Sequence, residues 1–174
     1  MAGASRSYGS LSEAAHYAPG RRLDPVVLAG WRLATLVCAD AWNPALPWLA
    51  AIGGAELFVV PAASSLGAVD GPFDNPTGWG VNLAHHAITY GLPVIFANHC
   101  GRRGDFVFWG GSRILAPGAR EWARPGGGGA LTPPAPAPAR GRPARRDLPT
   151  VRDADPALVG DLIAVHLESG APCP

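Results

Sequence analysis

The sequence contains no lysine, because all 14 of its basic residues are arginine. Chemistry that depends on a lysine side chain, as a base or as a mobile cation, therefore cannot come from these 174 residues. Arginine is nearly balanced by 13 acidic residues, which leaves a net charge of +1. We accordingly expect no binding to nucleic acid or to an anionic membrane surface, since neither would find an excess of positive charge.

Cysteine is also scarce, with only Cys38, Cys100 and Cys173 in the chain. Three is an odd number, and the spacing of these residues does not fit a set of metal ligands. A disulfide framework and a zinc site are both disfavoured, and we predict no metal. The pattern indicates a reducing compartment.

Long apolar runs are absent as well. The runs at 26–29 and 94–97 are far too short to cross a bilayer, and residues 1–9 have no apolar stretch like that of a secretory signal. We therefore expect a cytoplasmic protein with no membrane partner. With 48% hydrophobic residues, the chain has enough apolar material for the core of a single α/β domain.

Proline and glycine concentrate in residues 125–146, a low-complexity Pro/Gly/Ala/Arg segment. Its prolines remove the amide donors that a central strand needs, so we expect a disordered or extended segment. Its arginines could contact nucleic acid, although a solvated linker is the more common outcome of such a composition. Asp155-Pro156 then predicts the start of a helix that reaches about Leu167.

The most informative pattern lies in residues 31–61. Residues 33–37 are apolar and partly β-branched, which predicts a short strand buried on both faces. Asn43-Pro44 is typical of a helix start, Gly53-Gly54 of a helix end, and residues 56–60 of a second strand. Cys38 is thus expected at the carboxyl end of a strand and just before a helix.

Ligands of open α/β sheets bind at this end of the strands. A helix amino terminus lowers the pKa of a thiol and offers amides to an oxyanion, which makes Cys38 a candidate nucleophile. The plainer interpretation is that Cys38 is a small buried hydrophobic residue, as most reduced cysteines are.

Residues 64–80 are predicted to form a polar loop, and Phe73 and Trp79 within it are candidates for the walls of a substrate pocket, as is Trp42. The equally weighted alternative is that these aromatic side chains hold the loop against the core. Residues 110–112, Gly-Gly-Ser, are expected to permit close backbone approach near Cys38.

Four motifs, in order, resemble those of the nitrilase, or carbon-nitrogen hydrolase, superfamily. They lie at residues 38–44, 54–62, 82–98 and 108–118. The resemblance covers Tyr8 to about Leu115 and implies an α/β fold, a partial α-β-β-α sandwich. Residues 1–174 would then be a single carbon-nitrogen hydrolase domain that lacks its amino-terminal part.

In this family a cysteine attacks an amide or nitrile carbon, and water hydrolyses the resulting thioester. One glutamate is the general base, a lysine stabilises the oxyanion, and a second glutamate helps to hold the site. The resemblance assigns Cys38 as the nucleophile, Glu13 as the second glutamate and the amide of Ala39 as an oxyanion donor. Asp40 matches the aspartate two residues after the nucleophile. The resemblance also implies a small amide, carbamoyl or nitrile substrate and no cofactor.

The departures from the family pattern are specific. The family lysine would fall at about Ala2, and the general-base glutamate belongs to a preceding segment that this sequence does not contain. The chain therefore resembles an amino-terminally truncated or mis-started member, which in full-length form would be a homo-oligomer. The alternative is a catalytically incomplete fragment or pseudoenzyme that serves only as a structural or oligomer partner.

Other residues could replace the missing groups. Arg6 is the nearest cation to the vacant lysine position, and His16, His85, His86 and His99 are possible bases. His85 and His86 are adjacent on an expected helix and cannot both face one site, so a surface or core role is the plainer interpretation. His99 follows an expected strand end and is the best candidate to approach the pocket.

Overall fold

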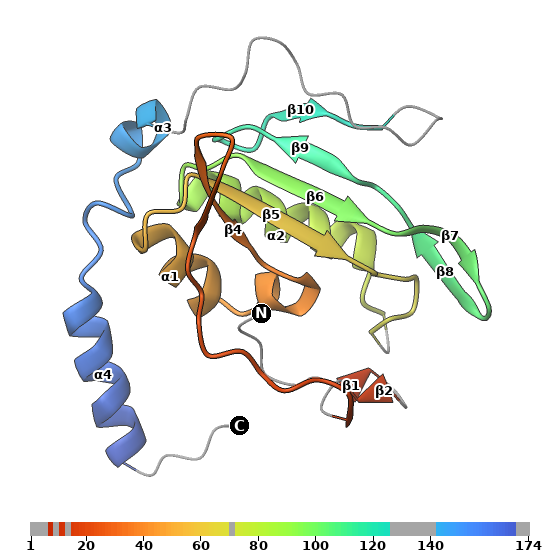
Figure 1. Cartoon of the computed structure of the whole chain (residues 1–174), viewed down its shortest axis with the longest axis horizontal. Coiled ribbons are helices and arrows are strands. Elements are labelled where there is room, and N and C mark those ends of the chain that lie inside the picture. The colour runs from red at the N-terminus through yellow and green to blue at the C-terminus, as the bar shows by residue number, and fades with distance from the viewer. Residues whose placement is uncertain (1–6, 9–10, 13–14, 70–71, 126–141, 170–174) are drawn as a thin grey trace.

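The computed structural model describes residues 7–8, 11–12, 15–69, 72–125 and 142–169. Its centre is a six-stranded sheet with the strand order β10-β9-β6-β5-β4-β3 (Figure 1). The strands of this sheet are β3 (Val26–Leu28), β4 (Trp31–Thr35), β5 (Leu57–Ala62), β6 (Val94–Asn98), β9 (Arg113–Leu115) and β10 (Glu121–Ala123). Two small pairs, β1 (Ser7–Tyr8) with β2 (Leu11–Ser12) and β7 (Cys100–Arg103) with β8 (Phe106–Trp109), lie outside it.

The middle of the sheet is parallel and its two edges are antiparallel. β5 pairs in parallel with both β4 and β6, and the crossovers contain α1 (Ala45–Ile52) and α2 (Asn75–Thr89). β3, β9 and β10 join in antiparallel fashion. This arrangement confirms the predicted α/β class, because alternating strands and helices produce parallel pairs.

Strand β3 lies within residues 1–30, a stretch whose sequence predicts a loop, so this prediction is wrong for Val26–Leu28. β3 and β4 form a hairpin whose two turn residues, Ala29 and Gly30, have positive φ angles of 49° and 77°. Such turns match the twist of paired strands, but alanine is a poor sequence signal for them. Ala18-Pro19-Gly20 is a hairpin-like sequence within this stretch, but these residues have no regular structure.

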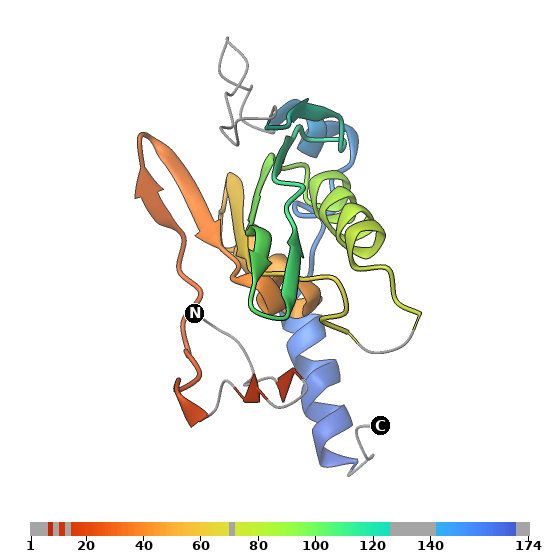
Figure 2. The same cartoon turned by 90° about the vertical axis from the view of Figure 1, so that its right-hand side faces the viewer.

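Helices α1 and α2 pack on one face of the sheet and form the core with it (Figure 2). On this face Ala34, Phe58 and Val94 lie side by side in register and are fully buried. On the opposite face Leu33 and Val59 are only half-buried and Thr35 is exposed. The prediction of a strand buried on both faces is therefore wrong for β4, because α1 and α2 cover the same face among the described elements.

The predicted helix boundaries are confirmed around α1. Asn43 Oδ1 accepts a hydrogen bond from the amide of Ala45 at 3.1 Å, and Gly53 caps the carboxyl end. Helix α2 starts at Asn75, well before the position expected for it, because Asp74 caps it by accepting from Thr77. Residues 75–80, predicted as loop, are thus helical.

The carboxyl-terminal segment docks on the core through α3 (Arg142–Asp147). Arg145 donates from Nε to the carbonyl of Tyr90 at 3.0 Å and from Nη2 to the carbonyl of Ala55 at 2.7 Å. Gly91 makes this contact possible, since a Cβ there would lie 2.8 Å from Arg145 Cγ. Most of the low-complexity segment, 126–141, lies outside the described residues, whereas 142–146, predicted as disordered or extended, are helical.

Helix α4 (Pro156–Glu168) begins as predicted, with Asp155 accepting a hydrogen bond from the amide of Leu158 at 2.9 Å. It extends away from the sheet in both views (Figures 1 and 2). None of its residues is buried, and all its large apolar side chains except Val159 are exposed. In the described part of the chain, no helix is both long and apolar enough to cross a membrane.

Candidate active site

Cys38 lies at a sharp turn at the end of the central parallel strands. The amide of Leu36 still donates to Val59 at 2.9 Å, and Cys38 then opens the short 3₁₀ helix η2 (Cys38–Trp42). Cys38 has a φ angle of +46°, and its side chain is half-buried. Positive φ strains a residue with a Cβ and persists only where the surroundings impose it. The expected position at a strand end is confirmed, but η2 separates the cysteine from α1.

Asp40 closes this turn from within, and we call residues 37–43 the elbow. The Asp40 carboxylate accepts from the amide of Val37 at 3.1 Å, and the Asp40 amide donates to the Val37 carbonyl at 2.9 Å. The Asp40 side chain is 5% exposed. The Asp40 carboxylate therefore stabilises the backbone just before Cys38.

Helix α2 supports the elbow from outside. Asn82 Nδ2 donates to the carbonyl of Ala41 at 3.2 Å, and His86 Nε2 donates to the same oxygen at 2.8 Å. His86 is 3% exposed, and burial lowers its pKa from 6.5 to about 4, so the ring is neutral near pH 7. His85 is exposed, in agreement with the expectation that His85 and His86 do not both face one site.

The three aromatic candidates for a pocket wall do come together. The Trp42 ring meets Phe73 at 5.9 Å and Trp79 at 5.1 Å between centroids. Trp79 is 2% exposed and donates from Nε1 to Ser64 Oγ, while the Phe73 ring covers Gly78 so closely that no Cβ would fit. These contacts favour the alternative that the aromatic residues hold the loop to the core, and a substrate-lining role remains a prediction.

Asn98 organises the neighbouring strand ends, a role that sequence reasoning did not identify. Its Oδ1 accepts from the amide of Ser64 at 2.8 Å, its Nδ2 donates to the carbonyl of Gly110 at 2.9 Å, and its amide donates to Ser112 Oγ at 3.0 Å. Gly110 itself lies against Cys100, because an added Cβ would sit 3.1 Å from the Cys100 Cβ. Gly110 and Ser112 therefore connect β6 to the β8–β9 turn, and the expected approach of Gly110 to Cys38 gains no support.

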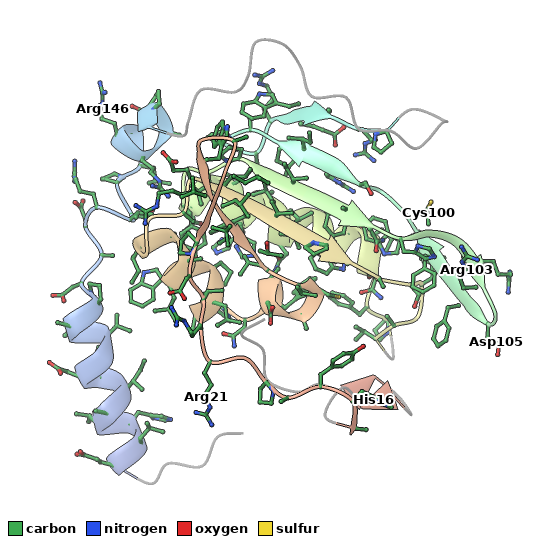
Figure 3. The ribbon with its side chains drawn as sticks, viewed as in Figure 1. His16, Arg21, Cys100, Arg103, Asp105 and Arg146 are labelled. Carbon is green, nitrogen blue, oxygen red and sulfur yellow. The ribbon has the colours of Figure 1, made fainter. Side chains whose placement is uncertain are left out.

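The remaining candidates are spread over the molecule. His99 is exposed, and its ring packs 4.6 Å from that of Phe108. His16 is exposed on the amino-terminal segment, and Cys100 is exposed on the β7–β8 hairpin (Figure 3). Ala39 directly follows Cys38 within η2. Glu13 and Arg6 lie outside the described residues, so their assigned roles remain predictions.

No group of three or more His, Cys, Asp or Glu side chains within the described ranges could hold a metal ion. What the elbow does present is a thiol on a strained backbone, with a buried carboxylate and two side-chain donors of α2 fixing the surrounding turn. Such rigidity suits a nucleophile, whose attack depends on its orientation.

Comparison with known proteins gives a family-level match. The family described as carbon-nitrogen hydrolase matches residues 6–128. A hydrolase encoded in the pqqF 5′ region of Pseudomonas protegens is 34% identical over 92 residues, which are 53% of this chain and 30% of that protein. A glutamine-dependent NAD(+) synthetase of Rhodobacter capsulatus is 36% identical over 96 residues, 54% of this chain and 16% of the relative. The chain thus spans under a third of either curated relative.

Solved structures agree on the fold. A carbon-nitrogen hydrolase from Helicobacter pylori G27 superposes with a TM-score of 0.71 at 24% identity, over 86% of this chain and 56% of that one. A variant of the amidase from Nesterenkonia sp. AN1, with acrylamide added at its active-site cysteine, gives a TM-score of 0.67 at 26% identity. That match covers 90% of this chain and 55% of the amidase. This chain therefore corresponds to about half of such a fold.

Proposed function

Because this chain belongs to the carbon-nitrogen hydrolase family, we propose that Cys38 is the nucleophile of a hydrolase that cleaves non-peptide C–N bonds in small amide, carbamoyl or nitrile substrates. The observation that carries the proposal is the strained, braced backbone at Cys38, with its φ of +46° at the end of the parallel strands. One variant of the amidase from Nesterenkonia sp. AN1, which this chain resembles, carries acrylamide added at its active-site cysteine, and another variant of that enzyme binds butyramide.

For an amide substrate, the thiolate of Cys38 attacks the carbonyl carbon and forms a C–S bond. The C–N bond then breaks, and the nitrogen leaves as an amine or ammonia after it gains a proton. Water next adds to the thioester, the C–S bond breaks, and a carboxylic acid and the thiol are released. The amide of Ala39 would stabilise the oxyanion of each tetrahedral intermediate.

Both steps need a proton acceptor and a cation that this lysine-free chain does not supply in the family manner. We propose that the general-base glutamate and the lysine come from a preceding segment of a longer, homo-oligomeric protein, and that Glu13 helps to hold the site. Trp42, Phe73, Trp79 and His99 remain candidates for the substrate pocket, and the cytoplasm remains the proposed compartment.

The test is single-turnover acylation by butyramide, quenched with acid, of the protein as purified from its source organism, followed by intact mass and peptide mapping. The purified protein is used because the 174 residues do not supply the base and the cation of the family. We expect a butyryl group on Cys38 and release of one ammonia per acylated chain, because formation of the thioester expels the nitrogen. Cys38→Ala should abolish the adduct. Cys100→Ala should retain it, since Cys100 lies on the exposed hairpin.

Absence of acylation at Cys38, or an adduct that survives Cys38→Ala, would contradict the proposal and favour a structural partner without catalysis. The intact mass of the protein purified from its source organism decides the related question of length. A mass well above 17.9 kDa would support a longer enzyme that contains the missing groups.

A further inference from the structure

We infer that His86 and Asn82 are positioning residues, which hold the Cys38 elbow in its strained conformation through the carbonyl of Ala41. The inference rests on the proposed function only in treating Cys38 as the nucleophile. The two side chains are one helical turn apart on α2, so they face the same way. Both donate to a single backbone oxygen, His86 at 2.8 Å and Asn82 at 3.2 Å.

The bonds fix the tautomer of His86. A carbonyl oxygen only accepts, so Nε2 must carry the proton and Nδ1 must be an unprotonated acceptor. Nδ1 of His86 and Oδ1 of Asn82 are buried and have no hydrogen-bond partner within the described part of the chain. Both side chains thus use their donors on Ala41 and leave an acceptor unsatisfied.

Packing alone does not explain why a histidine occupies position 86. The His86 ring stacks on Tyr90 at 5.9 Å and meets Phe58 edge-on at 6.2 Å, in surroundings that would accept an apolar ring. Burial of a polar ring with an unsatisfied nitrogen costs stability that a phenylalanine would not lose. What the histidine adds is the bond to the elbow.

The elbow needs such support because Cys38 occupies a left-handed conformation that a residue with a Cβ avoids. Asp40 braces the residues just before Cys38, whereas Ala41 lies on the other side of it, within the same short helix η2. His86 and Asn82 therefore tie the far end of the turn to α2, and the two supports together confine the cysteine.

A double-mutant cycle on thermal stability tests this coupling without any chemistry. Glycine tolerates positive φ, so Cys38→Gly should melt a few degrees above Cys38→Ala while the elbow is held. In the His86→Phe background the elbow can relax, and this difference should disappear. His86→Gln, which can place an amide donor near the position of Nε2, should restore it. If His86 only fills space, the difference will be the same in all three backgrounds, and the inference is wrong.

Should His86→Phe fail to fold, Asn82→Ala replaces it in the same cycle and should shrink the difference between glycine and alanine. A kinetic readout is independent of stability. In His86→Phe, acylation of Cys38 by butyramide, which needs an oriented thiol, should slow by at least about tenfold. Alkylation of the same thiol by iodoacetamide, which needs little orientation, should change less than about twofold. Equal changes in the two rates would overturn the inference. Absence of acylation in the unmutated protein would instead contradict the proposed function, and the double-mutant cycle on thermal stability would then decide whether His86 and Asn82 hold the elbow.

Discussion

The buried side chain of His86 makes the stability of the protein depend on pH. Burial lowers its pKa from 6.5 to about 4, the bond to Ala41 opposes this shift, and the charge of His85 adds to it. The unfolded chain therefore binds a proton more readily than the folded protein between pH 4 and 6.5. The free energy of unfolding therefore has its full value, as far as His86 is concerned, above pH 6.5. It decreases as the pH falls towards 4, by roughly 3 kcal/mol in total.

We predict that the free energy of unfolding, measured by urea titration, decreases from pH 7 to pH 4 in the unmutated chain and that His86→Phe removes most of this decrease. The control is His166→Gln, because His166 is exposed on α4. The interpretation fails if His86→Phe keeps the full pH dependence, or if His166→Gln removes as much of it.

At the scale of the elements, the short helix α3 contributes to stability because its Arg145 holds the carboxyl-terminal segment on the core. The Arg145 guanidinium is half-buried and bridges the carbonyl of Tyr90, which caps α2, to the carbonyl of Ala55, two residues before β5. Burial lowers the pKa of Arg145, but arginine remains charged at any relevant pH. Hydrogen bonds from a charged group contribute about 1.5–3 kcal/mol each, so this side chain secures the tail to the core.

Arg145→Ala is therefore expected to lower the melting temperature by several degrees, whereas Arg146→Ala should leave it within about a degree. The two arginines are neighbours in sequence, and Arg146 points into solvent from α3 (Figure 3). Differential scanning calorimetry of both variants distinguishes the bond network from a general effect of charge, since each variant removes one positive charge. Equal melting temperatures for the two variants would argue against the bridge.

Elements with strong local signals were predictable from sequence, and contacts between distant segments were not. Asn43-Pro44, Gly53 and Asp155-Pro156 mark helix ends by capping chemistry that acts over a few residues, and the structure places them accordingly. Asp74 carried the same signal for α2, but the surrounding glycines and prolines concealed it. The bonds from Asn82 and His86 to Ala41 join positions more than forty residues apart, and no local pattern predicts them.

At the scale of the whole molecule, the decisive feature is that the described helices α1 and α2 cover the same face of the sheet. The predicted partial sandwich agrees with this, since the chain matches 43–56% of the length of the solved relatives. Edge strand β3 exposes its apolar side chains, with Val26, Val27 and Leu28 between 61% and 70% accessible. An apolar edge strand favours pairing with a strand of another chain.

We predict that the 174-residue chain self-associates as its concentration rises, and that Val27→Glu keeps it monomeric in sedimentation velocity experiments. A charge on the edge strand disfavours strand pairing between copies. Val81→Glu is the matched control, because Val81 is 67% exposed but lies on α2. A monomeric unmutated chain at high concentration, or equal effects of both substitutions, would show that β3 does not drive association.

Helix α4 has a further consequence for the energetics of the molecule. It buries none of its 13 residues, so it gains little from the core and depends on its Asp155 cap and its own backbone bonds. A helix of this length is marginal in water, whatever the stability of the sheet. Its amides are thus expected to exchange with solvent through local opening that leaves the sheet closed, and the chain has a hierarchy of opening free energies in which α4 stands lowest and the strands around Phe58 highest.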